Sequence, residues 1–181
     1  MKIIKLLLRR RKVNLSTRTI TITGILSAVT IILAVTPLGF IPTPFGLATI
    51  MPVPVIIGAI IEGPVVGGFI GLIFGLFSFI RAGSPFIADP IVAIIPRVLI
   101  GVLAAYSYKL IKPQLIGSGV AAAVGFLANT GGVLTLATLR GYLNAEAALG
   151  IALIHGTPEL VVGVIVTLII VKVLQKTEAY N

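Results

Sequence analysis

Six apolar runs, separated by proline, glycine or charged residues, dominate this chain of 181 residues. They cover residues 19–38, 48–61, 64–80, 91–108, 117–139 and 147–171. An α-helix needs about 20 apolar residues to cross the hydrocarbon core of a bilayer. The sequence therefore predicts an all-α membrane protein with six transmembrane helices. The second run is short and opens with Pro52 and Pro54, so we expect it to be tilted, partly unwound, or joined to the third as a hairpin turning at Glu62-Gly63-Pro64.

The composition and the placement of charge agree with a membrane protein. Hydrophobic residues make up 57% of the chain and the mean hydropathy is +1.17, which excludes a soluble domain of this size. Seven lysines and arginines precede residue 19, whereas Arg81 and Arg140 alone fall in the loops predicted on the other side. This bias places both termini in the cytoplasm. We expect a basic amphipathic segment on the lipid surface at 1–18, a transmembrane domain at 19–172 and a cytoplasmic tail at 173–181. The net charge of +9 then reflects topology, and nucleic acid is not an expected partner.

Several chemistries have no support in the sequence. The chain has no cysteine and one histidine, which leaves no thiolate or multi-histidine metal site. It has no phosphate-binding glycine loop followed by Lys and Ser or Thr, so energy for transport would come from a gradient or a partner. No nucleophile and base stand at a defined spacing. We therefore expect no enzyme activity, no cofactor and no metal.

Five polar residues interrupt the last three runs at similar depth. They are Arg97 on the fourth run, Asn129 and Thr130 on the fifth, and His155 and Glu159 on the sixth. At about 1.5 Å per residue they lie roughly 9 to 18 Å below the outer ends of their helices. Small residues four positions away share their faces, so these faces point into protein. Pro96 and Pro158 lack the amide hydrogen that a helix uses, which frees carbonyls at the same depth.

Two interpretations of this polar band remain open. In the structural one, Arg97 and Glu159 neutralise each other, Asn129 joins two helices and His155 is a satisfied interior residue. In the functional one, the guanidinium of Arg97 binds the carboxylate of a small anion, while Asn129, His155 and Glu159 bind its hydroxyl and amide groups.

Small residues also form stripes on two helices. Gly63, Gly67, Gly71 and Gly75 follow one another at intervals of four on the third run, and Gly24 and Ala28 form a similar pair on the first. Such spacing lets another helix approach closely. It serves either packing inside the bundle or docking of another membrane subunit.

The first predicted outer loop, residues 39–47, reads GFIPTPFGL and carries no charge. Its prolines and glycines make it stiff and apolar, which suits either a plain connector or a lid over a site. The residues expected to form that lid are Phe40, Ile41, Pro42, Thr43, Pro44 and Phe45.

Taken together, the chain from residue 19 onward resembles the substrate-binding S components of energy-coupling factor (ECF) vitamin transporters. The resemblance lies in the six spans, the basic amino end, the loop GFIPTPFGLATI and the following VPVIIGAIIEGPVVGGFIGLIFGLFSFIRA. Within that family it is most similar to the pantothenate-specific subgroup. That similarity rests on ADPIVAIIPRVLIGVLAAYSY, on Asn129-Thr130 and on Pro158-Glu159.

The resemblance implies the S-component fold and a vitamin pocket that faces outward beneath the first loop. Carried over by position, the binding role falls on Arg97, Asn129 with Thr130, and Glu159, and His155 is added on chemical grounds. S components dock on a transmembrane coupling subunit bearing two ATPases, through small residues of the first span. The family's Ala-xxx-Ala pattern is matched here only by Gly24 and Ala28.

The expected function is that of a vitamin-binding subunit in a prokaryotic cell membrane, with pantothenate as substrate because its carboxylate matches Arg97. A riboflavin or other B-vitamin S component is the alternative. A membrane scaffold with a purely structural polar core is a more distant one.

Overall fold

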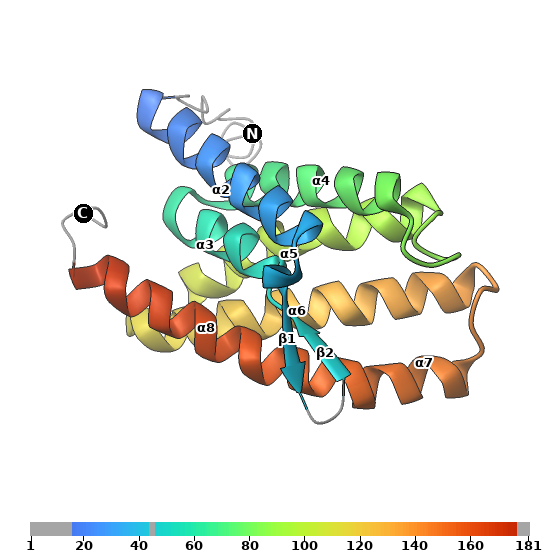
Figure 1. Ribbon diagram of the computed structural model, residues 1–181. Coiled ribbons are helices and arrows are strands. Elements are labelled where there is room, and N and C mark those ends of the chain that lie inside the picture. The colour runs from blue at the N-terminus through green and yellow to red at the C-terminus, as the bar shows by residue number, and fades with distance from the viewer. Residues whose placement is uncertain (1–15, 44–45, 177–181) are drawn as a thin grey trace, which may run out of the picture.

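The structure, a computed structural model, describes residues 16–43 and 46–176. Most of the predicted basic segment 1–18, part of the tail 173–181, and Pro44 and Phe45 of the predicted lid lie outside this range. In the described part, six helical rods lie side by side (Figure 1). They are α2 (Thr17–Val35), α3 (Pro52–Glu62), α4 (Pro64–Arg81), α5 (Pro90–Leu110), α6 (Gln114–Leu139), and a last rod made of α7 (Ala145–Ile151), the π-helical turn η2 (Ala152–Gly156) and α8 (Thr157–Lys176).

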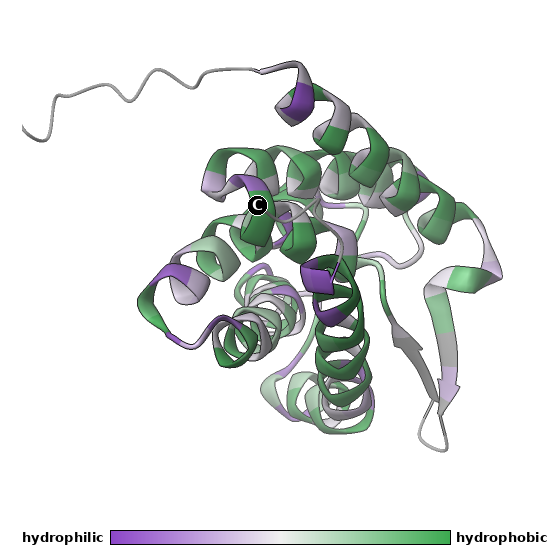
Figure 2. Cartoon of the chain, turned by 90° about the vertical axis from the view of Figure 1, so that its left-hand side faces the viewer, coloured by the Kyte–Doolittle hydropathy of each residue, from purple (hydrophilic) through white to green (hydrophobic). Residues whose placement is uncertain are grey.

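Five of these rods are long and apolar enough to cross a membrane. The remaining rod, α3, is shorter, with 11 residues. It turns directly into α4 at Gly63, whose φ of 96° favours glycine. The predicted all-α membrane fold and the predicted helical hairpin are thereby confirmed. Figure 2 shows hydrophobic residues along most of each helix, with hydrophilic ones gathered mainly near helix ends.

The core of the bundle surrounds the short helix α3. Nine of its residues, from Pro52 to Ile60, are buried, which is expected for a helix that is apolar on all sides. By contrast, α2 lies at the edge of the bundle, and only Thr19, Ser27 and Thr30 of it are buried. A helix so little covered by its own chain presents most of its surface to lipid or to another protein.

Glycines let α4 and α5 approach until their backbones touch. A Cβ placed on Gly101 would collide with the backbone of Gly67, and one on Gly71 would collide with the carbonyl of Arg97. A Cβ on Gly75 would lie 2.8 Å from the Cα of Ile94. The glycine stripe of the third run therefore serves packing inside the bundle, with α5 as its partner.

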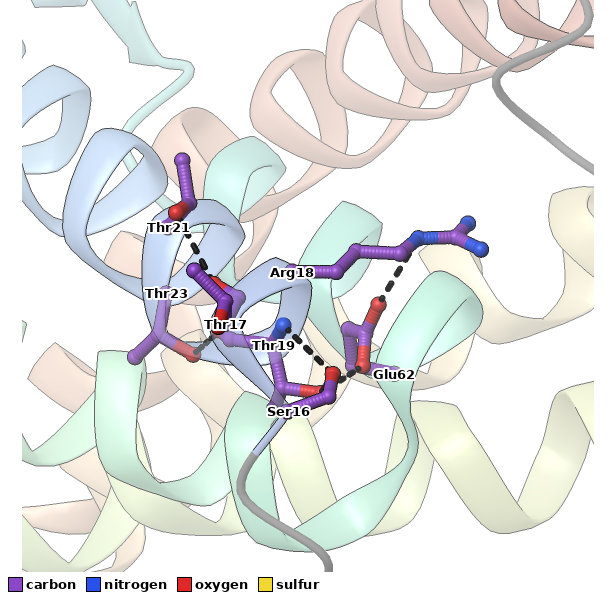
Figure 3. A network of polar contacts seen from close by, with 7 residues as sticks. All are labelled: Ser16, Thr17, Arg18, Thr19, Thr21, Thr23 and Glu62. Atoms are coloured by element: carbon purple, nitrogen blue, oxygen red, sulfur yellow. Dashed lines mark hydrogen bonds and ion pairs between the residues drawn. The ribbon is translucent and has the colours of Figure 1, made fainter.

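The start of α2 is tied to the end of α3 by a polar cluster (Figure 3). The hydroxyl of Ser16 caps α2 by accepting from the amide of Thr19. Thr19 Oγ1 donates to Glu62 Oε2 at 2.9 Å, and Arg18 Nε lies 3.7 Å from Glu62 Oε1. This cluster lies at the end of the bundle where α2 begins and α8 ends.

The loop predicted to lie outside contains a β-hairpin. After the 3-10 turn η1 (Pro37–Gly39), strands β1 (Phe40–Thr43) and β2 (Gly46–Thr49) pair in antiparallel fashion, with Phe40 opposite Thr49. This corrects the start of the second predicted span, because residues 48 and 49 belong to β2 and α3 begins only at Pro52. The hairpin extends beside α8 and η2 (Figure 1).

Candidate functional site

A cavity of about 650 Å³ opens among the hairpin, α4, α5, α6 and the last rod. This volume falls within the range of pockets that bind small organic molecules. All five side chains predicted from the sequence to bind substrate line its wall: Arg97 from α5, Asn129 and Thr130 from α6, His155 from η2 and Glu159 from α8. The structure thus brings together residues that lie up to 62 positions apart in the chain (159 − 97).

The carboxylate of Glu159 is buried and accepts three hydrogen bonds. Thr49 Oγ1 donates to Oε1 at 2.5 Å, and Asn129 Nδ2 donates to the same oxygen at 3.3 Å. Thr130 Oγ1 donates to Oε2 at 2.6 Å. Hydrogen bonds to an ionised group are stronger than those between neutral groups, so Glu159 links α6, α8 and the hairpin through one side chain.

Arg97 is 7% exposed, and the proline before it leaves a backbone carbonyl free to accept a hydrogen bond from its side chain. Pro96 has no amide hydrogen to give to the carbonyl of Val92, four residues earlier. Arg97 Nη1 donates to that carbonyl at 3.0 Å instead. The guanidinium also lies 5.5 Å from the centroid of the Phe74 ring, which is cation–π distance.

Arg97 and Glu159 do not form the ion pair of the structural interpretation. Among the described residues the nitrogen-to-oxygen contacts of 4.0 Å or less join Arg18 to Glu62 and Arg140 to Asp89, and none joins Arg97 to Glu159. Both charged groups therefore face the same cavity with separate partners.

Three residues that line the cavity each have a buried polar atom with no hydrogen-bond partner among the described residues. These atoms are Nε of Arg97, a donor, Oδ1 of Asn129, an acceptor, and Oγ of Ser84, which can do either. A buried polar atom without a partner costs about 1 to 3 kcal/mol, so native proteins rarely keep one without use. The lining residues thus offer one charged donor, one neutral acceptor and one hydroxyl to a ligand.

His155 lies at an interruption in the last rod. Pro158 cannot donate to the carbonyl of Ile154, so the α-helical register is broken there, and the π turn η2 precedes it. Such turns recur at functional sites. The His155 side chain is exposed and reaches the cavity wall.

The sequence interpretation missed two residues of the site. Thr49 follows the predicted lid by four positions, and no pattern in the loop indicated that a strand would carry it to Glu159. Phe74 lies three residues after Gly71, on the side of α4 that faces α5. The spacing of the glycine stripe could have placed it near Arg97.

Asp89, the N-cap of α5, follows two positions after Ile87, which lines the cavity. Its carboxylate accepts from the amide of Ile91 at 2.9 Å, from Arg140 Nε at 2.8 Å and from the Tyr142 hydroxyl at 3.3 Å. Burial alone would raise the pKa of Asp89, but the Arg140 hydrogen bond and charge, with the other two donors, outweigh it and hold the pKa below 3.8. The cluster joins the α4–α5 loop, which contributes Phe86 to the cavity wall, to the α6–α7 loop.

Comparison with known proteins agrees with this architecture. The family described as "ECF transporter, substrate-specific component" matches residues 18–174. The pantothenic acid transporter PanT of Lactococcus lactis subsp. cremoris is 32% identical over 157 residues, which covers 71% of this chain and 78% of that protein.

The family match spans all six helical rods up to the last turn of α8. It assigns the chain a transport role, and the membrane-length helices agree with a multi-pass protein of the cell membrane. The chain therefore belongs to the substrate-specific components of ECF transporters.

Proposed function

We propose that this chain binds pantothenate in the cavity and delivers it to an ATPase-driven coupling module. The observation that carries the proposal is that Arg97 Nε and Asn129 Oδ1 are buried without a partner among the described residues, in side chains that line the same cavity as Glu159. The name of the L. lactis relative, a pantothenic acid transporter, supports the same substrate.

The chemistry of pantothenate fits these groups one by one. Its carboxylate accepts from Arg97 Nε, and a charge-assisted bond of this kind is about twice as strong as a neutral one. Its amide or hydroxyl hydrogens donate to Asn129 Oδ1. The remaining hydroxyl reaches Glu159, where it competes with Thr130, and His155 closes the outer side of the ligand.

Riboflavin is the second candidate, because four phenylalanines line the cavity and a flat ring system binds well between aromatic walls. They are Phe40, Phe74, Phe77 and Phe86. Riboflavin has no carboxylate, however, and would offer Arg97 only neutral acceptors. Pantothenate is therefore the better match to the charge on the wall.

The hairpin acts in this proposal as the lid, with Phe40, Ile41, Pro42, Thr43, Pro44 and Phe45 as its residues. The support is the bond from Thr49, at the base of β2, to Glu159 in the cavity. Replacing Thr49 with Val removes this bond and should speed release of bound pantothenate up to about tenfold. Unchanged release from T49V would exclude a lid held by Thr49.

The coupling subunit docks, in this proposal, on the face of α2 that carries Gly24 and Ala28, with both chain ends in the cytoplasm. Both residues are exposed, and a Cβ on Gly24 would meet nothing within 4 Å. Gly24→Leu should abolish co-purification with the coupling module while leaving vitamin binding intact. Full co-purification of this variant would place the docking surface elsewhere.

Thermal unfolding of the purified full chain, with each B vitamin added separately, tests the substrate. A ligand at 100 times its Kd stabilises the folded state by about 2.7 kcal/mol, so one vitamin should raise Tm clearly above the others. Pantothenate is the expected hit. A shift with riboflavin alone would favour the second candidate, and no shift with any vitamin would favour a purely structural polar core.

A further inference from the structure

A second arginine lies at the mouth of the cavity. Arg81 is the last residue of α4, its side chain is exposed, and it lines the same cavity as Arg97. Its Nη1 donates to the carbonyl of Ala34 at 2.7 Å, in the last turn of α2. Carbonyls in the last turn of a helix have no amide partner within the helix. This bond therefore holds the guanidinium at the rim.

The charge of Arg81 is not neutralised locally. The other arginine at this end of the bundle, Arg140, is paired with Asp89 at 2.8 Å. No carboxylate lies within 4.0 Å of Arg81 in the part of the chain that the structure describes. The charged groups on the cavity wall are thus two guanidinium groups and one carboxylate, with the exposed positive charge outermost.

We propose that Arg81 is a steering residue, which draws an anionic ligand to the cavity mouth and speeds its association. The inference rests on the proposed function, because it requires a carboxylate ligand. A cleft with low-dielectric walls focuses the field of its charges and raises the association rate of an oppositely charged ligand, by about tenfold or more at low salt. A charge at a rim acts chiefly on association, and its effect falls as salt screens it.

The alternative is that Arg81 only caps α2. Arg81→Gln separates the two roles, because glutamine keeps an N–H donor for the Ala34 carbonyl and removes the charge. Arg81→Lys keeps the charge. Lys112→Gln is the matched control, since it removes one exposed charge in the loop between α5 and α6, at the opposite end of the bundle.

The test measures binding of radiolabelled pantothenate to the purified full chain by rapid filtration. Rates are compared at about 0.01 M and about 1 M salt, where the Debye length is about 30 Å and 3 Å. At low salt R81Q should lower the association rate several-fold and leave the dissociation rate unchanged. The rates should converge at high salt, and R81K and K112Q should match the parent. Pantothenol, the neutral alcohol, should associate equally with R81Q and the parent.

Equal association of pantothenate with R81Q and the parent at low salt would overturn the inference and leave the proposed function standing. An equal loss for pantothenol would also overturn it, because the role would then be structural. If the parent binds no pantothenate, both the proposed function and this inference are wrong. Arg81→Met serves as a second neutral variant in case R81Q does not fold.

Discussion

At the scale of single residues, the site depends on a proline that changes what a helix backbone can bind. Pro96 leaves the Val92 carbonyl without its helical partner, and Arg97 takes that place with Nη1. One nitrogen of the guanidinium group is thereby held in place, and Nε keeps no hydrogen-bond partner among the described residues. A charged residue inside the bundle is in this way both oriented and left with a donor for a ligand.

Pro96→Ala should separate stability from binding. The new amide hydrogen of residue 96 can bond to the Val92 carbonyl, so the helix is not weakened. Stability can even rise, because a proline in a helix interior costs about 3 kcal/mol relative to alanine. Arg97 loses its anchor, and pantothenate affinity measured by calorimetry should fall about tenfold while Tm holds or rises. Pro90→Ala is the control, because Pro90 starts α5, where no amide partner is missing. Equal affinity of P96A and the parent would contradict this role.

The lowered pKa of Asp89 predicts how the stability of the fold changes with pH. Its pKa is lower in the folded state than the ordinary 3.8, so its stabilising effect is present above pH 3.8 and is lost as the pH falls through the folded value. Asp89→Asn keeps an oxygen for the Ile91 amide but loses the charge opposite Arg140. Its Tm should be a few degrees below that of the parent at neutral pH, and the gap should narrow below pH 3.8. A gap that stays constant across this range would show that the charge is unimportant.

At the scale of helices, the contact between α4 and α5 decides where Arg97 lies. Gly67 and Gly101 meet backbone to backbone, and Gly71 packs on the carbonyl of Arg97 itself. The stripe therefore aligns α5 against α4 and holds the Phe74 ring near the guanidinium. Packing and site geometry are determined by the same glycines.

Gly101→Ala should lower both stability and affinity. The added methyl group would collide with the backbone of Gly67, which cannot move aside as a side chain can, and overpacking of this kind typically costs about 1 to 3 kcal/mol. Gly24→Ala is the matched control on α2, where the added atom meets nothing within 4 Å. We expect G24A to match the parent in Tm and in pantothenate binding. Equal behaviour of the two variants would contradict the packing account.

The elements were predictable from the sequence wherever apolar runs of bilayer length ended at proline, glycine or charge. The hairpin was not, because residues 39–47 carry three prolines or glycines near its turn and no alternation of polar and apolar residues. Hydropathy also extended the second run over residues 48–51, since Ala48 and Ile50 are as apolar in a strand as in a helix.

At the scale of the molecule, the cavity lies toward one end of the bundle, and the start of α2 and the end of α8 lie toward the other. The Ser16, Thr19 and Glu62 cluster lies at the end where α2 begins, whereas Arg81 lines the cavity and Asp89 caps the start of α5 at the other end. The helix α2 runs along the edge between these two ends (Figure 1). Its last turn bonds to Arg81 at the cavity, and its first turn bonds to Glu62 at the opposite end.

Long-range contacts set the limit of what the sequence could predict about the site. Arg97, Asn129 and Glu159 were recognisable because each is polar within an apolar run. The partner of each was not, because the bond from Thr49 to Glu159 joins residues 110 positions apart. Charge alone left an ion pair between Arg97 and Glu159 open, but two hydroxyls and an amide donate to the Glu159 carboxylate instead.

Calorimetric titration of the parent and Arg97→Gln with pantothenate and with pantothenol tests the central proposal, that Arg97 binds the carboxylate of the substrate. Loss of one partner from a buried charge pair costs about 2 to 5 kcal/mol, so R97Q should bind pantothenate at least about 30-fold more weakly than the parent. Pantothenol, which has no carboxylate, should bind both proteins with similar affinity. If folded R97Q binds pantothenate as tightly as the parent, Arg97 is not the carboxylate anchor.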